Sequence, residues 1–438
     1  MFLSRTLLIR ACVAGTFAAL AGMMLDGQMA AAPEPRWWKG NLHTHTLWSD
    51  GDGFPEVIAE WYRDHGYHFL ALSDHNIQST VERWMLVRNI NERARADAMG
   101  RYQARYGDSW VETRGKSAEG PVEVRLKTLD EVRSLVEERN RFLMIPSEEL
   151  TGGAGDGHTL HLNATNLSEL LPYQMGATVR DTMTRNLQAV EDSAKRTGRD
   201  VMLHVNHPNY KWGVTAEDLA AVVGERFFEV WNGVDGDNDP GDAVRASTDE
   251  IWDIANTLRI VKYGAAPLYG LATDDSHDHH GTKTHSPPGR GWTMVRARHL
   301  SPNSIVRAFR AGDFYASTGV ELRDVSFDKQ ARVYRVQIAG KAGVEYVTRF
   351  IGTRKGANIV GKPRVDGNGQ AVDTTLDYTM AGRPRIGEVL AEAKGLSAEY
   401  RMKGDELYVR AVVTSNAAPA VASQEARYQR AWTQPAGW

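Results

Sequence analysis

Two histidines separated by one residue, His43 and His45, are the first residues of this 438-residue chain whose types and spacing could do chemistry. On an extended segment the side chains alternate between two faces, so a His-x-His pair points to one face. Paired imidazoles can bind a divalent metal ion, but a metal site needs further ligands. The pair predicts a metal centre if the rest of the chain supplies those ligands.

Metal-binding residue types recur downstream within, or at the ends of, short apolar segments that are typical of buried strands. The segment 67–73 is followed by His75, and the segment 142–145 is followed by Glu148 and Glu149. Loops after parallel strands converge at one end of an α/β sheet, so ligands from distant segments can meet there. The predicted metal ligands are His43, His45, Asp50, His75, Glu149, His161, His207, Asp275 and His277.

The first 32 residues are typical of an export signal. Arg5 and Arg10 precede an apolar run over 11–25, and alanines at 30–32 offer a cleavage site before Pro33. The run is short for a membrane span, so we expect the signal to be removed and no stable span to remain. The absence of a twin arginine favours the general secretory route. The mature protein is predicted to be periplasmic or secreted.

Composition narrows the choice of metal and partner. The single cysteine, Cys12, lies in the predicted signal, so the mature chain has neither thiolate ligands nor disulfides. Imidazole and carboxylate ligands suit Zn, Mn or Fe better than Ca or Mg. The formal net charge of −3 gives no basic footprint of the kind that proteins carry when they bind long nucleic acids.

The elements that must position these ligands alternate between strands and helices. Apolar residues at helical spacing, with a proline in the first turn, predict a helix over 55–62 that Gly66 ends. Thr128 and Glu131 form a capping-box pattern at the start of another helix. Further strands are predicted at 142–145, 158–164, 201–207, 227–233, 269–273 and 312–319, and a helix at 304–310.

Beyond residue 320 the hydrophobic pattern changes to alternation with period 2. Apolar and polar residues alternate over 334–338 and 407–413, and the segment 403–405 carries a turn glycine. This pattern predicts an antiparallel β-rich appendage to an α/β fold. The predicted organisation is a signal over 1–32, an α/β domain over 33–320, and a β-rich domain over 321–438.

Several segments with notable composition are assigned to structural roles. Residues 80–120 predict a helical excursion with a solvated face. The glycine-rich loop 152–157 lacks the Lys-Ser/Thr pair of a P-loop and predicts a flexible turn. The acidic loop 235–239 departs from the EF-hand because Pro240 stands where glycine is required, so a solvated loop is predicted. His279, His280 and His285 are predicted to lie in a mobile solvated loop.

As a set, these motifs resemble those of the PHP (polymerase and histidinol phosphatase) superfamily over residues 37–320. The resemblance implies a distorted (β/α)7 barrel with a two- or three-metal site that mostly hydrolyses phosphate esters. Three further motifs, 229–233, 311–315 and 431–435, are similar to the branch that contains carbaryl hydrolase. The motifs that carry the main resemblance are His43-Thr44-His45, Ser73-Asp74-His75-Asn76, the Glu149 segment, His207-Pro208 and Asp275-Ser276-His277.

The resemblance also implies how the ligands divide among the metals. One metal would be surrounded by His43, His45, Glu149 and Asp275. Glu149 would bridge to a second metal held by His161 and His207. A third metal would be held by Asp50, His75 and His277. Three alternatives stay open, namely Glu148 for Glu149, His158 for His161 and His204 for His207.

The function that the resemblance implies is an exported metal-dependent hydrolase in which a metal-bridging hydroxide is the nucleophile. We predict a phosphoesterase for phosphomono- or phosphodiesters, with a carbamate or carboxylic ester hydrolase as the alternative chemistry. A non-catalytic metal-bound glycan- or partner-binding protein is the alternative of another class. His277 and Asp275 are candidates to donate the proton of the leaving group, and Arg290 and Lys211 to bind an anionic substrate. The predicted partner is a small-molecule ester, and the oligomeric state is left open.

Overall fold

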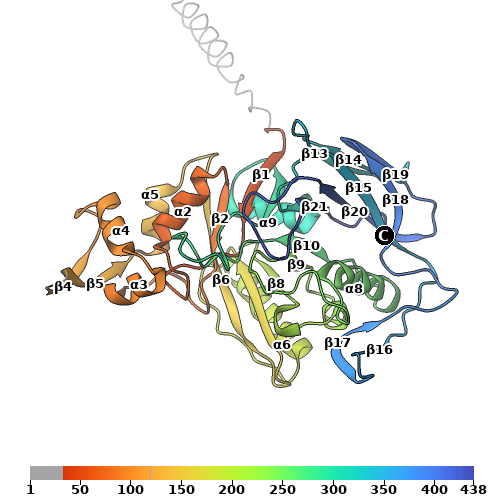
Figure 1. The fold of residues 1–438 in the computed structure, drawn as a ribbon, viewed down its shortest axis with the longest axis horizontal. Helices are drawn as coiled ribbons and strands as arrows, with labels where there is room; N and C mark the ends of the chain where they lie inside the picture. The colour runs from red at the N-terminus through yellow and green to blue at the C-terminus, as the bar shows by residue number, and fades with distance from the viewer. Residues whose placement is uncertain (1–32, 119) are drawn as a thin grey trace, which may run out of the picture. The chain divides into compact units, whose positions relative to one another are not determined.

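Short runs of apolar residues build the central strands of a 13-stranded mixed sheet (Figure 1). The computed structural model describes residues 33–118 and 120–438, so the predicted signal and its Cys12 lie outside the described residues. Every residue is buried in the four strands β2 (Phe69–Leu72), β8 (Met202–Val205), β9 (Phe227–Trp231) and β10 (Tyr269–Ala272). Continuous apolar runs of this kind are typical of strands that are covered on both faces.

Parallel pairing places the carboxyl ends of several strands, and the polar residues that follow them, at one edge of the sheet. β1 (Arg36–Asn41) pairs with β2, and β2 pairs with β6 (Leu143–Gly153). β8 pairs with β9, and β9 pairs with β10, again in parallel. The carboxyl ends of parallel strands are where α/β proteins bind ligands.

The helices that connect these strands begin and end at the predicted signals. α2 (Pro55–Asp64) has its proline in the first turn, and Gly66 beyond it has a φ of 78°. α5 (Leu129–Val136) begins with the capping box of Thr128 and Glu131. Both helix predictions are confirmed. The other helices of the sheet connections are α6 (Val179–Thr197), α7 (Ala216–Ala221), α8 (Thr248–Lys262) and α9 (Pro302–Ala311).

Helices α8 and α9 supply large side chains to the core of the sheet. Trp252 of α8 is buried in one hydrophobic cluster with Phe228 and Trp231 of β9. Phe309 of α9 is buried in another with Phe69 of β2. Both faces of the parallel strands are therefore packed, and polar residues are left to the strand ends.

β7 (Thr159–Thr165) departs from a uniform succession of parallel strands. It pairs antiparallel with both β6 and β8. The loop 154–158 between β6 and β7 is too short for the crossover that a parallel pair requires, so it closes a hairpin. Gly152 and Gly153, which were predicted to lie in a flexible turn, are the last residues of β6.

The segments that follow β1 and β10 meet through backbone hydrogen bonds. The amide of His45 donates to the carbonyl of Ser276 and the amide of Asp275 donates to that of His43, each at 2.9 Å. These bonds flank an isolated parallel bridge between Thr44 and Ser276. Among the described residues β10 and β1 form no strand ladder, so the fold is α/β with a large mixed sheet rather than a demonstrated closed (β/α)7 barrel.

Four C-terminal strands continue the same sheet. β21 (Arg430–Thr433) pairs antiparallel with β12 (Phe314–Ser317) and β20 (Glu406–Ser415), β20 pairs with β15 (Tyr346–Arg354), and β15 pairs with β18 (Glu388–Lys394). β11 (Trp292–Ala297) lies between β1 and β12 in this sheet. Residues Pro35–Trp438 form one compact unit.

The other C-terminal strands form two separate sheets. One consists of β13 (Leu322–Asp328), β14 (Val333–Ile338) and β19 (Ser397–Arg401), and the other of β16 (Lys362–Val365) and β17 (Ala371–Asp377).

A small sheet in the order β3-β5-β4 interrupts the chain between β2 and α5 (Figure 1). Its strands are β3 (Arg83–Leu86), β4 (Thr113–Ser117) and β5 (Gly120–Leu126), and they accompany helices α3 (Val87–Ala94) and α4 (Ala98–Tyr106). The prediction of a purely helical excursion over 80–120 is wrong. Every residue of β4 is exposed, so its sequence carries no alternation that would reveal a strand. In the part of the chain that the structure describes, no helix is long and apolar enough to cross a membrane.

Candidate metal centre

The predicted ligands meet at the carboxyl ends of the parallel strands. His43, His45 and Asp50 follow β1, His75 follows β2, Glu149 lies in β6, His161 in β7, His207 follows β8, and Asp275 and His277 follow β10. Their ligand atoms fall into four overlapping groups, in each of which the atoms lie within 4.8 Å of one another. The structure therefore brings all nine together, although they span more than half of the chain.

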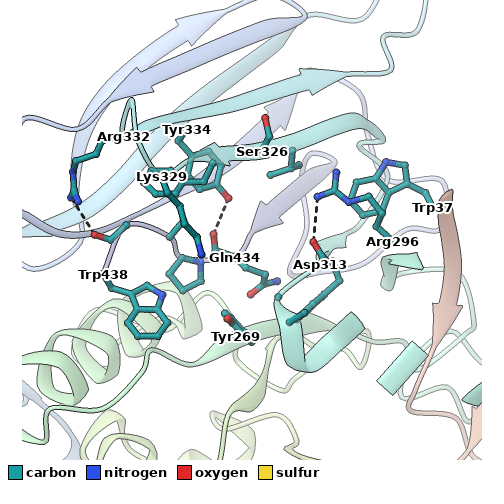
Figure 2. Close-up of a pocket in the computed structure, with 18 residues that line it drawn as sticks. Trp37, Tyr269, Arg296, Asp313, Ser326, Lys329, Arg332, Tyr334, Gln434 and Trp438 are labelled. Atoms are coloured by element: carbon teal, nitrogen blue, oxygen red, sulfur yellow. Dashed lines mark hydrogen bonds and ion pairs between the residues drawn. The ribbon is translucent and has the colours of Figure 1, made fainter. Parts of the chain in front are cut away.

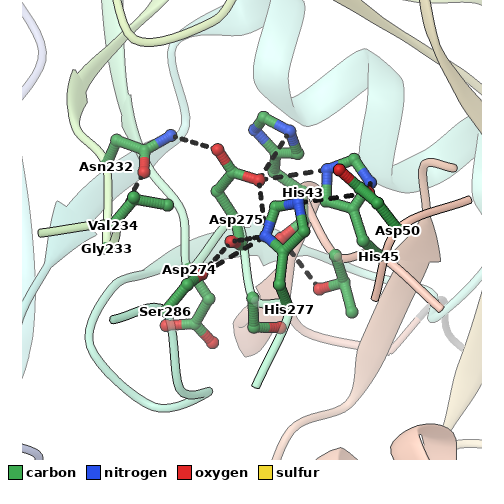
Figure 3. Close-up of polar contacts among 12 residues, drawn as sticks. His43, His45, Asp50, Asn232, Gly233, Val234, Asp274, Asp275, His277 and Ser286 are labelled. Atoms are coloured by element: carbon green, nitrogen blue, oxygen red, sulfur yellow. Dashed lines mark hydrogen bonds and ion pairs between the residues drawn. The ribbon is translucent and has the colours of Figure 1, made fainter. Parts of the chain in front are cut away.

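The first group consists of His43, His45 and Asp275 (Figure 3). Nε2 of His43 and Nε2 of His45 lie 3.2 and 3.0 Å from Oδ1 of Asp275. Each imidazole nitrogen also lies 3.5 Å from a carboxylate oxygen of Glu149. Two ligand atoms bound at about 2.1 Å to a tetrahedral metal are about 3.4 Å apart, so this spacing fits one divalent ion.

The second group consists of Glu149, His161 and His207. Oε1 of Glu149 lies 3.1 Å from Nδ1 of His161 and 3.7 Å from Nε2 of His207. Glu149 thus faces both the first and the second group. A carboxylate in this position can bridge two metal ions.

The third group consists of His45, Asp50, His75 and His277. Asp50 Oδ2 lies 3.2 Å from His75 Nε2, and Asp50 Oδ1 lies 3.3 Å from His277 Nε2. The side chain of Asp50 is 56% exposed, whereas that of Glu149 is fully buried. The third group therefore forms the solvent-facing side of the centre.

Several buried ligand atoms of the centre have no hydrogen-bond partner. They include Nε2 of His43, Nε2 of His45 and Oδ1 of Asp275. Buried polar atoms in proteins are nearly always satisfied, so unsatisfied atoms that face one another require another explanation. The donor set, which consists of imidazole and carboxylate, fits divalent ions of the Zn, Mn and Fe type.

The two central carboxylates are held in their charged form. Burial alone would raise the pKa of Glu149, but the surrounding histidines, led by His161, hold it well below its usual range. Burial would also raise the pKa of Asp275, and His43, His45 and His277 likewise hold it well below its usual range. Asp275 therefore fits a metal-binding carboxylate, and its role as a proton donor stays a prediction.

Outside the ligand groups, a buried carboxylate orients the first histidine. Nδ1 of His43 lies 2.8 Å from Oε1 of Glu229 in β9, which leaves Nε2 to face the metal position. Glu229 also accepts hydrogen bonds from the amide of His207 and the hydroxyl of Thr273, each at 2.8 Å. Partners of this kind fix the tautomer of a metal ligand. In the sequence, Glu229 stands out only as part of the motif 229–233.

Two further aspartates hold the ligand-bearing loops. Asp74 accepts hydrogen bonds from the amide and hydroxyl of Thr46, each at 2.8 Å. Asp274 accepts from Tyr62 Oη at 2.8 Å and from backbone amides that include that of Arg290 at 2.7 Å. Asp274, which directly precedes Asp275, is therefore a structural residue outside the ligand groups.

Two of the ligands have strained backbones. The φ angles of His207 and Asp275 are 21° and 46°. Positive φ is uncommon for residues with a side chain, and strain of this kind clusters at functional sites. At both residues the backbone amide is fixed, by Glu229 and by the carbonyl of His43 respectively.

The structure separates the three pairs of alternative ligands. Glu149, His161 and His207 belong to ligand groups, and their alternatives belong to none of those found among the described residues. Oε1 of Glu148 accepts a hydrogen bond from the amide of Leu171 at 2.7 Å, Nε2 of His158 lies 3.3 Å from Oδ2 of Asp373, and Nε2 of His204 lies 3.4 Å from Oε1 of Glu229.

Arg290 does not reach the centre. Its guanidinium is buried and donates to the carbonyls of Gly233 and Ala422 at 2.7 and 2.8 Å, and to Oδ2 of Asp235 at 2.9 Å. With its donors engaged in this way, Arg290 holds loops together, and its prediction as a substrate-binding residue is wrong.

Lys211 lies at the edge of the centre. It is exposed in the short helical turn Tyr210–Trp212, with Nζ 5.0 Å from the centroid of the Tyr210 ring. That ring lies 5.1 Å from the ring of His207. The Tyr210 ring thus contacts both Lys211 and His207, and the role of Lys211 in binding an anionic substrate stays a prediction.

Two loops that were predicted to be solvated are held in place. Asp235, Asp237 and Asp239 are all buried, so the acidic loop is not a solvated one. In the loop after His277, Nε2 of His280 lies 3.0 Å from the carbonyl of Asp52. The predicted exposure is wrong for the acidic loop, because contacts with distant segments cover it. In the loop after His277 it is right for His285, which is exposed, whereas His279 and His280 are half-buried.

A cavity of about 750 Å³ lies apart from the ligand groups (Figure 2). It is lined by residues of β10, β12 and the C-terminal segment, such as Tyr269, Phe314 and Gln434. None of the predicted ligands lines it. This cavity is therefore not part of the metal centre.

Comparisons with known proteins give distant likenesses. No protein-family model matches the chain, and no curated protein matches it. A two-domain protein from Bacteroides vulgatus, described as containing a predicted PHP-like metal-dependent phosphoesterase, is similar in structure with 14% identity and a TM-score of 0.39, over 90% of this chain and 94% of that one. A protein from Bifidobacterium adolescentis, provisionally described as a metal-dependent phosphoesterase, has 11% identity and a TM-score of 0.32, over 57% of this chain and 91% of that one. Because these scores are low, the functional argument rests on the side chains of the centre.

Proposed function

We propose that this chain is a PHP-type metal-dependent hydrolase of phosphomono- or phosphodiesters. The observation that carries the proposal is the sharing of buried carboxylates between adjoining ligand groups. Asp275 of the first group also lies 3.6 Å from Nδ1 of His277 of the third group, and Glu149 contacts the first and second groups. Shared carboxylates hold metal ions close together, which is the arrangement used for in-line displacement at phosphorus.

Divalent ions bound here would supply positive charge for the developing charge on phosphoryl oxygens and would activate water near neutral pH. The chain's own residues provide the orientation. Glu229 fixes the His43 ring, and Lys211, whose ammonium lies near the Tyr210 ring, is the candidate cation for an anionic substrate. His277 is a candidate for protonating the leaving group only where it binds no metal, because it belongs to the third ligand group and a metal-bound imidazole nitrogen carries no proton.

Hydrolysis of a carbamate or carboxylic ester is the second candidate, since the same centre could act on a carbonyl. Its support in the sequence includes the motif 431–435, but the structure gives that motif a role in the fold. Trp432 Nε1 donates to Asp249 Oδ1 at 3.1 Å, and Gln434 exchanges hydrogen bonds with the backbone of Gly270. We therefore rank phosphoester hydrolysis first.

A non-catalytic metal-bound protein that binds a glycan or partner is the candidate of another class. It would retain the same ligands but would show no turnover. For location we propose the periplasm or the medium, on the basis of the sequence pattern of residues 1–32. Cell fractionation that finds the full-length chain in the cytoplasm would overturn the proposed location.

The proposed function is tested by elemental analysis of the purified protein together with a panel of aryl phosphomonoesters, phosphodiesters and carbamates, each with Mn or Zn. We expect two or three metal ions per chain and hydrolysis of the phosphoesters. His43→Ala should lose metal and hydrolysis together, whereas His158→Ala, whose imidazole lies outside the ligand groups, should keep both. Full hydrolysis by metal-analysed His43→Ala, or bound metal without any turnover, would overturn the proposal.

A further inference from the structure

The loop between β9 and α8 carries a carboxylate whose surroundings are unusual. Asp237 is 3% exposed, and its Oδ2 is buried without a hydrogen-bond partner. Neighbouring Asp239 is equally buried: its Oδ2 accepts a hydrogen bond from the amide of Asn232 at 2.6 Å, and its Oδ1 has no partner. Of the two aspartates, only Asp237 faces metal ligands. An ionised carboxylate is costly to bury unless a cation or hydrogen bonds compensate it.

Asp237 points at two of the metal ligands. One carboxylate oxygen of Asp237 lies within 4.8 Å of ligand atoms of both His207 and Asp275, which are themselves within that distance of each other. His207 also belongs to the second ligand group with Glu149 and His161. Asp237, His207 and Asp275 therefore form a fourth ligand group, which adjoins the second group at His207 and the first at Asp275.

A residue of the C-terminal segment holds this loop in place. Oε1 of Glu425 accepts hydrogen bonds from the amides of Gly236 and Asn238, each at 2.9 Å, and Oε2 accepts one from the amide of Asp239 at 3.0 Å. Three amides that converge on one carboxylate fix the backbone on both sides of Asp237. The neighbouring Asp235 is held as well, by Ser423 Oγ at 2.9 Å and by Arg290.

We propose that Asp237 is a further metal-ligating residue, which forms a metal position together with His207 and Asp275, and that Glu425 positions it. This inference rests on the proposed metal centre and deepens it. With Asp237 this position has two carboxylates and one imidazole. The added oxygen ligand shifts the preference towards Mn²⁺ or Fe²⁺ relative to Zn²⁺, because oxygen ligands suit the harder ions. It also gives the C-terminal segment a part in the centre, since Glu425 belongs to that segment.

The test is calorimetric titration of the metal-free full chain with Mn²⁺, combined with the electron paramagnetic resonance signal of bound Mn²⁺. We expect Asp237→Asn to lower the affinity of the protein for one Mn²⁺ by at least ~10- to 100-fold. Removing a residue that only hydrogen-bonds to a metal ligand already has an effect of this size. Asp239→Asn is the matched control, because it is a buried carboxylate of the same loop outside the ligand groups. It should bind Mn²⁺ like the wild type.

Glu425→Ala should weaken the same Mn²⁺ and alter its spectrum, and Glu425→Gln, which keeps one acceptor oxygen, should restore part of the affinity. Circular dichroism and thermal unfolding of each metal-free variant identify any that fail to fold. If Asp237→Asn does not fold, Asp237→Ser, which puts a smaller polar group in place of the carboxylate, is used instead. Wild-type affinity in a folded Asp237 variant would overturn the inference and leave the proposed function intact. Failure of the wild type itself to bind metal would overturn the proposed function.

Discussion

Nδ1 of His43 lies 2.8 Å from Oε1 of Glu229, and both side chains are fully buried. This contact joins the loop after β1 to β9. The same carboxylate accepts a hydrogen bond from the amide of His207, which lies in the loop after β8. Glu229 therefore fixes the ring of one ligand and the backbone of another. Because His207 has a positive φ, its amide needs a partner of this kind to hold the strained backbone.

Glu229→Gln should weaken metal binding while leaving the ligands themselves unchanged. Both oxygens of Glu229 accept hydrogen bonds. The amide nitrogen of glutamine would replace one of these acceptors with a donor, so one hydrogen bond would be lost. We expect metal affinity to fall by ~10- to 100-fold, as measured by calorimetric titration. Glu225→Gln, a buried carboxylate four residues earlier in the chain and outside the ligand groups, is the control. Equal affinities in the two variants would contradict the orienting role of Glu229.

The adjacent carboxylates Glu148 and Glu149 should behave differently. Glu149→Gln removes a ligand that faces two groups, so we expect the loss of at least one bound metal ion. The rate of hydrolysis should fall by more than ~100-fold, which exceeds the effect of removing a residue that only hydrogen-bonds to a ligand. Glu148→Gln keeps an oxygen that can accept the amide of Leu171, so metal content should stay at the wild-type value. Elemental analysis after desalting measures both, and a loss of metal in Glu148→Gln alone would reverse the assignment.

Much of the centre is predictable from sequence because its ligands obey a local rule. His75, His207 and Asp275 each follow a short apolar run, and parallel strands deliver the residues at their ends to one edge. Nothing more than strand order is then needed to bring them together. The antiparallel β7 does not disturb this, because His161 lies opposite Thr151 in the hairpin and so reaches the same edge.

The residues that sequence reasoning misplaced depend on contacts between distant segments. Asp237 stands in an acidic loop of ordinary appearance, and its burial follows from Glu425, which is 188 positions further along the chain. Arg290 is a surface-type residue by composition, yet its donors are used by Gly233 and Ala422. No periodicity or motif in the sequence carries such pairings, so these roles require the structure.

Glu225 should make stability depend on pH. Burial raises the pKa of Glu225 from 4.5 to about 8, although its Oε1 accepts the amides of Arg226 and Phe227. Because the folded-state pKa lies above the unfolded one, the folded state binds more protons between these values. The stabilisation is fully present below about pH 4.5 and is lost as the pH rises to about 8.

Relative to Glu225→Gln, the wild type should therefore lose ~1.4 kcal/mol of unfolding free energy for each pH unit within this window. Urea unfolding at a series of pH values, with metal concentration fixed, measures the difference between the two proteins. Metal-linked pH effects are common to both and cancel in that difference. Parallel stability curves for the two proteins across this range would show that Glu225 is already ionised in the folded state.

Arg410 of β20 should be a major link between the C-terminal strands and α8. Its buried guanidinium donates to Oδ1 and Oδ2 of Asp253 at 2.9 and 2.7 Å, and it lies 3.1 Å from Oδ1 of Asp249. Arg410→Ala leaves the buried Asp253 without its cation, whereas Asp249 keeps Arg430 at 3.2 Å. We expect it to lower the unfolding free energy by ~3–5 kcal/mol, because breaking a buried ion pair leaves an uncompensated charge.

Arg349→Ala is the matched control, because Arg349 pairs with Glu392 across β15 and β18 at 2.9 Å with both side chains about half exposed. An exposed pair contributes at most ~1 kcal/mol, so urea unfolding should separate the two variants clearly. Since β20 and α8 are joined through Arg410, the wild type should also unfold in a single transition seen by both tryptophan fluorescence and circular dichroism. Two separate transitions, or a loss of less than ~1 kcal/mol in Arg410→Ala, would show that the C-terminal strands are stabilised independently of α8.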